Sequence, residues 1–221
     1  MTLTETLEQL KDLGNDKMRL QNIKKGAGNN QYGVRLGDIK KLGKQIKINL
    51  ELALALWDTK NIEARLLSTI IIKPNTLTLE QLDQMVRSIT FVQVADWFNA
   101  YVVKPHPENE RLREDWMKSE HPMAARAGWN LTSIRVAKNP AGLVLNALLN
   151  SIEKKMLLAH PLVQWTMNFT LAEIGIKHPD FRKRALSIGE NLGVYRDFPV
   201  SKGCTSPFAP LWIAAMVNRE K

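Results

Sequence analysis

The sequence predicts an all-α protein whose helices pair and stack into a solenoid. Apolar residues recur three and four positions apart through most of the chain, which is the spacing of one helix face. Prolines stand before or between these stretches, where a helix tolerates a missing N–H. Polar residues interrupt the apolar helices at intervals of roughly 30 to 40 residues, the period of two-helix repeats. We therefore expect one α-solenoid domain over residues 1–221, without a flexible linker.

The limits of the helices follow from capping residues and from the prolines. Thr78 and Gln81 have the spacing of a capping box, in which each side chain accepts a hydrogen bond from the other residue's backbone. Pro74 and Pro105 separate neighbouring helices. Residues 195–210 precede the last helix and lack a helical period. The predicted helices are residues 3–13, 15–24, 36–48, 49–58, 61–73, 78–89, 91–103, 108–118, 121–136, 143–156, 161–176, 178–192 and 209–219.

Four of the apolar helices carry one narrow polar stripe each. Residues three or four apart share a helix face, so the members of a stripe point in one direction. A buried polar group without a partner costs about 1–3 kcal/mol, so successive stripes are expected to line a common solvated groove. The stripes are Arg65 with Thr69; Gln93, Asp96 and Asn99; Arg126 with Asn130; and Gln164 with Asn168. Their recurrence resembles HEAT-type repeats, in which the inner helices line a concave face.

The balance of charges is basic. Lys and Arg number 31 against 22 Asp and Glu, which gives a formal charge of +9. Such a charge attracts a polyanion, and nucleic acid is the partner that charge and groove together favour. Lys40, Lys44 and Lys47 lie along one face of the predicted helix 36–48 and are expected to contact phosphates. Binding is therefore expected to weaken as salt is added.

Composition argues against several other classes of protein. Charges interrupt the apolar runs before they reach the ~20 residues that span a bilayer, and the start lacks the basic end and apolar block of a secretory signal. We expect a cytoplasmic monomer, associated with the nucleoid when bound to DNA. The four histidines are scattered and Cys204 is the single cysteine, so no metal site, no cofactor and no internal disulfide are expected.

Two non-helical stretches each have more than one interpretation. Residues 26–33 contain three glycines and form a loop with positive-φ positions. This loop can cradle a phosphate, although a lone Gly-x-Gly outside a strand–helix context is weak evidence. Residues 195–210 are either a functional loop or a cap that covers the last repeat with Phe198, Phe208 and Trp212. Cys204 lies in this segment without a histidine placed to activate it.

Several motifs resemble one known family. They are the run from Gln31 to Leu42 (QYGVRLGDIKKL), the helix with Glu63-Ala64-Arg65, the aromatic helix that contains Asp96 and Asn99, and the helix that contains Arg126. Together, and in this order over most of the chain, they resemble the AlkD-type DNA alkylation repair proteins. The resemblance implies a HEAT-like α-solenoid whose concave face holds duplex DNA. It also implies kinship with glycosylases that remove positively charged alkylated purines.

The resemblance also implies roles for residues of the aromatic helix. The family's catalytic helix has an aromatic residue, an Asp and, three residues after it, a second Asp that acts on the sugar. With Asp96 on the first Asp, Asn99 takes the second position and supplies no negative charge. Ala95 takes the aromatic position, although Trp97 is close in sequence. Either Asp96 itself faces the groove and stabilises the positive charge that builds on the sugar, or it pairs with Arg126 or another interior polar residue.

The sequence therefore predicts a protein that binds double-stranded DNA in its concave face. It either excises alkylated purines or is a non-catalytic relative that binds distorted DNA. An adaptor that binds an acidic protein segment and an RNA-binding protein are the alternatives. The family resemblance implies that Arg126 takes the place of a basic residue that contacts DNA near the damaged base. It also implies that Phe169 takes the place of a second aromatic residue around that base. The expected DNA-contacting residues are Arg65, Gln93, Trp97, Arg126, Asn130, Gln164, Asn168, Phe169, Lys40, Lys44 and Lys47.

Overall fold

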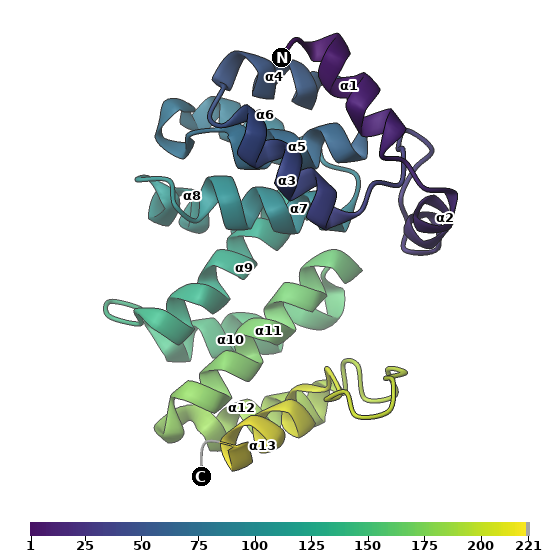
Figure 1. The fold of residues 1–221 in the computed structure, drawn as a ribbon. Helices are drawn as coiled ribbons and strands as arrows, with labels where there is room; N and C mark the ends of the chain where they lie inside the picture. Colours follow the sequence, from purple (N-terminus) through teal and green to yellow (C-terminus); the bar gives the residue numbers. More distant parts are fainter. Residues whose placement is uncertain (220–221) are drawn as a thin grey trace. The chain divides into compact units, whose positions relative to one another are not determined.

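The computed structural model describes residues 1–219 of the chain (Figure 1). Within these residues it contains thirteen α-helices and no β-strand, which confirms the predicted all-α class. Among the same residues, no helix combines the length and the apolar character that crossing a bilayer requires. The helices are α1 (Leu3–Asp12), α2 (Asp16–Lys24), α3 (Leu36–Ile46), α4 (Leu50–Asp58), α5 (Ile62–Ile71), α6 (Leu79–Arg87), α7 (Val92–Phe98), α8 (Asn109–Trp116), α9 (Pro122–Lys138), α10 (Leu145–Lys155), α11 (Pro161–Lys177), α12 (Pro179–Leu192) and α13 (Ala209–Arg219).

Local signals set the helix ends, and every end except that of α7 lies within two residues of its predicted limit. Thr78 caps α6 as predicted. Its hydroxyl accepts from the Gln81 N–H at 3.1 Å, and the Gln81 side-chain oxygen accepts from the Thr78 N–H at 2.8 Å. The same reciprocal pair of bonds, between Thr2 and Glu5, begins α1. These caps satisfy N–H groups that have no acceptor inside the helix.

The exception is the helix predicted over residues 91–103. Its α-helical part, α7, ends at Phe98 and continues as a π-helical turn over Asn99–Val103. In this turn the Lys104 N–H donates to the Asn99 carbonyl at 2.9 Å, five residues back instead of four. Apolar spacing does not distinguish the two kinds of turn over so few residues.

Residues 1–110 form the first of two compact units. In this unit 1, α5 packs against α3, α4 and α7. Leu56, Leu67 and Phe98 are fully buried among these helices. Burial of such side chains is the main stabilising contribution, at about 1.5–3 kcal/mol each. The single domain expected over residues 1–221 stays a prediction.

The second compact unit, unit 2, begins at Arg111. Its two long helices, α9 and α11, each have 17 residues and pack side by side (Figure 1). The helix α11 also contacts α12 and α13. Gly175 permits the close approach of α13, since a Cβ there would lie 2.4 Å from Cδ1 of Ile213. Met167 and Leu171 of α11 are buried in this core.

Candidate functional site

In unit 1, a lysine of α3 lies over an aromatic ring at the end of α7. The Nζ atom of Lys40 is 5.4 Å from the centre of the Trp97 ring. Tyr101, one turn after Trp97, packs edge-on against it at 5.3 Å between ring centres. Trp97 is half-buried and the other two side chains are exposed. A cation over an indole at an exposed site gains about 0.5–1 kcal/mol, which holds the lysine near the ring while its charge stays in solvent.

The remaining lysines of this helix face are also exposed. Lys44 lies one turn after Lys40, and Lys47 follows the end of α3 with a positive φ of 64°. We call the group of Lys40, Lys44, Lys47, Trp97 and Tyr101 the α3–α7 surface. Four of these residues were predicted from the sequence as DNA contacts, whereas the contact between Lys40 and Trp97 and the presence of Tyr101 were not. The position of Tyr101, four residues after Trp97, was the available signal for the ring pair.

The two residues that the family resemblance assigns to chemistry lie in different environments. Asp96 is exposed to solvent on α7. Asn99 is 4% exposed and begins the π-helical turn. Gln93, earlier in the same stripe, is half-buried. The carboxylate of this stripe is thus on the solvent side, and the amide that occupies the expected carboxylate position is in the interior.

The buried side chain of Arg65 makes hydrogen bonds within unit 1. Its side chain is 5% exposed, and its guanidinium donates to the carbonyls of Trp57 at 3.0 Å and Ser88 at 2.7 Å. The same guanidinium lies 4.9 Å from the centre of the Trp57 ring. Burial lowers the pKa of Arg65, and the nearby charge of Asp58 opposes this shift. These bonds join α4, α5 and the end of α6, and a contact between Arg65 and DNA stays a prediction.

The loop that connects α2 to α3 is tied to a buried carboxylate. Glu63, at the start of α5, is 1% exposed. It accepts hydrogen bonds from the backbone N–H groups of Tyr32 at 2.9 Å, Gly33 at 2.8 Å and Val34 at 3.2 Å. Amides that a phosphate would need are therefore already bonded to Glu63. These three amides are not available to a phosphate, and use of residues 26–28 of the loop as a phosphate cradle stays a prediction.

In unit 2, the predicted polar residues bond to nearby backbone. Arg126 is 5% exposed and donates to the Leu162 carbonyl at 3.2 Å. Gln164 donates to the Leu157 carbonyl at 3.2 Å. Asn168 donates to the Pro207 carbonyl at 2.8 Å, whereas its own buried Oδ1 has no hydrogen-bond partner within residues 1–219. Asn130 is half-buried. A role for these residues in DNA binding stays a prediction.

Five aromatic rings form a continuous cluster beside these polar residues. Trp165 lies 5.5 Å from Phe169, 5.2 Å from Tyr195 and 5.9 Å from Phe198, measured between ring centres. Phe169 also packs edge-on against Trp212 at 4.6 Å. We call these five residues the aromatic cluster. Phe169 was predicted from the sequence as a DNA contact, and Phe198 and Trp212 as residues of the alternative cap, whereas Trp165 and Tyr195 were not predicted.

Tyr195 is the polar member of the aromatic cluster. Burial raises the pKa of its phenol, and the positive charge of Arg126 acts in the opposite direction. Its backbone has a φ of 64°, which is uncommon for a bulky residue. An arginine charge and an aromatic phenol therefore lie close to each other in unit 2.

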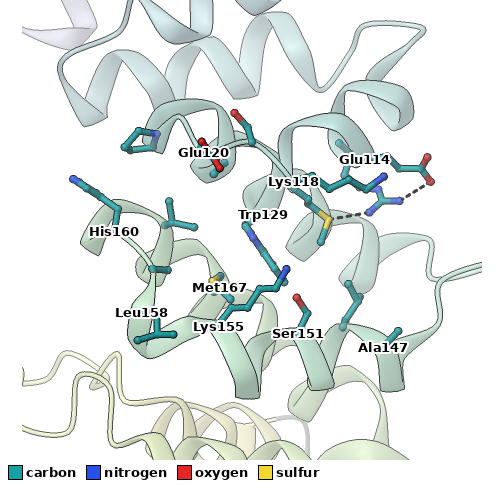
Figure 2. Close-up of a pocket in the computed structure, with 18 residues that line it drawn as sticks. Glu114, Lys118, Glu120, Trp129, Ala147, Ser151, Lys155, Leu158, His160 and Met167 are labelled. Carbon is teal, nitrogen blue, oxygen red and sulfur yellow. Dashed lines mark hydrogen bonds and ion pairs between the residues drawn. The ribbon is translucent and has the colours of Figure 1, made fainter.

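A separate pocket of about 690 Å³ opens in unit 2 between the α8–α9 and α10–α11 pairs (Figure 2). Trp129 and Met167 contribute apolar walls, and Lys118 and Lys155 lie at its rim. Its lining residues on α9 do not include Arg126, so this pocket and the predicted polar stripe use different faces of that helix. Within residues 1–219, no cluster of three or more His, Cys, Asp or Glu side chains is suited to hold a metal ion.

Comparison with known proteins places the chain among DNA repair proteins and their relatives. The model of the family described as DNA alkylation repair enzyme matches residues 3–192. Uncharacterized protein Lmo0209 of Listeria monocytogenes is 24% identical over 195 residues, covering 86% of this chain and 85% of the relative. Uncharacterized protein Lin0241 of Listeria innocua is 23% identical over 193 residues, covering 85% and 84%.

One solved structure has a similar fold. It is described as coming from a new family of proteins related to the HEAT-like repeat DNA glycosylases, with affinity for branched DNA structures. It matches this structure with a TM-score of 0.83 at 21% identity, covering 100% of this chain and 95% of that one. The fold predicted from the recurring stripes is therefore confirmed as HEAT-like.

Proposed function

Since this chain belongs to the DNA alkylation repair enzyme family, we propose that it binds branched double-stranded DNA without excising a base. A relative of the same fold has affinity for branched DNA structures. The observation that carries the absence of excision is Asn99, a buried neutral amide at the position where the resemblance expects a carboxylate. Binding of this kind would keep the protein with chromosomal DNA.

Exposed charge supports DNA as the partner. The formal charge of the chain is +9. Lys40, Lys44 and Lys47 are exposed on the α3–α7 surface, where water-accessible ammonium groups can replace the counterions of a phosphate backbone. Trp97 and Tyr101 add aromatic area beside these charges, which suits contact with sugar and with base edges. This combination serves DNA of any sequence, because phosphate contacts carry no sequence information.

The residues of the aromatic helix argue against excision. Breaking an N-glycosidic bond builds positive charge on the sugar, and a carboxylate close to it lowers that barrier. Asn99 is 4% exposed and carries no charge. Asp96 does carry a charge but is exposed to solvent, where water weakens its effect on a nearby cation.

The test compares DNA shapes and looks for released base. A three-way junction and a linear duplex with the same arm sequence are titrated with the protein at several salt concentrations. We expect tighter binding of the junction, and affinity for both that falls steeply with salt. Duplex DNA carrying 7-methylguanine is incubated in parallel, and no free base is expected. Base release that is lost in Asp96→Asn would overturn the non-catalytic assignment and make Asp96 the carboxylate.

A charge-reversal variant tests the α3–α7 surface. Lys40→Glu with Lys44→Glu is expected to lower DNA affinity and to reduce the slope of log affinity against log salt by about 1.8, for two lost phosphate contacts. Lys154→Glu with Lys183→Glu makes the same change in net charge on α10 and α12, and serves as the control. Equal effects of the two variants would contradict a defined surface. Failure of both DNAs to bind at low salt would overturn the proposal and favour the acidic protein segment as partner.

A further inference from the structure

The aromatic cluster has the composition of a protein core but lies at the surface of unit 2. None of its five rings is buried, and Phe198 is 43% exposed. Phe208, from the C-terminal segment of residues 195–210, is 3% exposed, whereas the cap predicted as one alternative for this segment stays a prediction. Contiguous exposed aromatic area on a folded protein marks a binding surface more often than a structural one. The buried Phe208 ring and the less buried Tyr195 and Phe198 rings are thus separate parts of one segment.

The segment that presents the Tyr195 and Phe198 rings is held in place at several points. Asn168 of α11 donates to the Pro207 carbonyl at 2.8 Å. Arg196 lies over the Phe208 ring at 4.5 Å and donates to Glu190 at 2.8 Å. Figure 1 shows this segment, in yellow, between α12 and α13. Such anchoring lowers the entropy that the rings lose when a ligand binds.

The backbone at Tyr195 is itself unusual. Its φ of 64° places a bulky side chain in the left-handed region, at a cost of roughly 1–3 kcal/mol that the surrounding contacts must offset. The conformation brings the Tyr195 ring against both Trp165 and Phe198, at 5.2 and 5.7 Å between ring centres. Strained residues of this kind concentrate at ligand-binding sites.

Positive charge accompanies the rings. Arg126 is close enough to Tyr195 for its charge to lower the pKa of the phenol against the effect of burial. Arg196 follows Tyr195 directly, and its guanidinium is exposed while bonded to Glu190. Aromatic rings beside arginines are the combination that binds unpaired nucleotides, since the rings stack on bases and the cations attract the backbone.

We propose that Tyr195 and Phe198, supported by Trp165, form a stacking site for an unpaired base at the branch point of bound DNA. This inference rests on the proposed function and names the element that distinguishes branched from linear DNA. Bases inside an uninterrupted duplex have both faces covered by their neighbours, whereas a branch with unpaired nucleotides exposes them. The site therefore adds affinity only for the branched form. Tyr195 and Phe198 both lie after residue 192, where the match to the family model ends.

The test uses a three-way junction with two unpaired bases at the branch, one of them the fluorescent base 2-aminopurine. Stacking on the protein rings is expected to change its fluorescence on binding. Phe198→Ala is expected to weaken junction binding roughly 5- to 150-fold, the effect of losing one stacked base, and to leave linear duplex affinity unchanged. Phe198→Tyr keeps a ring and should retain the wild-type affinity and fluorescence change.

Leu211→Ala provides the matched control, because Leu211 is an apolar side chain of the same unit, 55% exposed and outside the aromatic cluster. Thermal unfolding of each variant checks that the fold is retained. Equal junction affinities of the wild type and Phe198→Ala, while the wild type still prefers the junction, would overturn this inference and leave the proposed function standing. No DNA binding by the wild type would overturn both.

Discussion

The loop of residues 25–35 and the segment of residues 193–208 are the two longest non-helical stretches within residues 1–219, and the fold holds them in opposite ways. In the first, three backbone N–H groups point inward and bond to Glu63, which is 1% exposed. In the second, a backbone carbonyl bonds to Asn168, while the Phe198 ring stays 43% exposed.

This difference shows how a structural loop can be distinguished from a binding loop of similar composition. A Gly-rich loop offers its amides to a ligand only if no side chain has taken them, and here Glu63 has taken three. A segment whose backbone is anchored but whose large rings remain exposed keeps its binding capacity. Residues 32–34 of the first loop therefore have a structural role, and the later segment carries our proposed base site.

The largest expected effect follows from replacing Glu63, the carboxylate that anchors the loop of residues 25–35. Glu63→Gln replaces a buried carboxylate that accepts three backbone hydrogen bonds with an amide whose NH₂ group opposes those donors. We expect the free energy of unfolding to fall by roughly 3–5 kcal/mol, measured by urea denaturation. Glu51→Gln, on the exposed surface of α4, is the control and should change stability little. If Glu63→Gln lowers the free energy of unfolding as little as Glu51→Gln does, the loop does not depend on this carboxylate.

The next largest effect is expected when one glycine from each of the two stretches is replaced and the losses of stability are compared. Gly33 and Gly203 have positive φ angles of 79° and 84°. A Cβ at Gly33 would lie 2.4 Å from the Asn15 carbonyl oxygen, whereas a Cβ at Gly203 would meet nothing within 4 Å. We expect Gly33→Ala to cost about 3 kcal/mol from backbone strain plus overlap, and Gly203→Ala about 1 kcal/mol from strain alone. Equal losses in thermal or urea unfolding would contradict the tight packing of the first loop.

A smaller effect is expected where the second segment is anchored. Asn168→Ala removes the bond to the Pro207 carbonyl and should cost about 1 kcal/mol of local stability. Limited trypsin digestion measures this change, because cleavage after Lys202 follows the population of the opened segment. Asn191→Ala, on the exposed side of α12, serves as the control. Unchanged cleavage in Asn168→Ala would place the anchor in the aromatic contacts instead.

The smallest effect concerns the ionisation of Tyr195. Burial raises its pKa above the ordinary value of 10.0, so the folded state holds the phenolic proton more tightly than the unfolded state. The associated stability is present below pH 10.0 and is lost as the pH rises through the raised pKa.

Alkaline difference spectra between the wild type and Tyr195→Phe isolate this group, and their midpoint should lie above 10.0. Arg126→Ala should raise the midpoint further, since the Arg126 charge lowers it. Lys40→Ala removes a charge from unit 1 and is expected to leave the midpoint where it is. A fall in the midpoint in Arg126→Ala would contradict the proximity of the two side chains.

Much of the fold could be predicted because helix ends depend on neighbours in sequence. The capping bonds of Thr78 and the prolines that begin α9, α11 and α12 act within one turn of the chain. The π-helical turn at Asn99 could not be predicted, because it depends on how a short stretch packs against the rest of unit 1. Recurring polar stripes were sufficient to predict the HEAT-like fold, as the solved relative confirms.

The candidate site could be predicted only in part. Exposed lysines on one face of α3 followed from helical spacing, but the contact between Lys40 and Trp97 joins residues far apart in sequence. Arg65 and Arg126 were predicted as groove residues, and both are bonded to backbone carbonyls in the interior of their units. A sequence records the polar type of a residue but not the partner that folding brings to it.

The sequence by itself therefore determined the helices, the repeat class, the basic charge and the neutral residue at Asn99, because these are properties of short segments or of composition. Only the tertiary structure decided that Glu63 accepts hydrogen bonds from the backbone of the loop before α3. It also decided that Tyr195 and Phe198 pack against Trp165 at the surface. Both outcomes depend on contacts between residues far apart in sequence, which exist only once α5 has packed against α3, and α11 against α12 and α13.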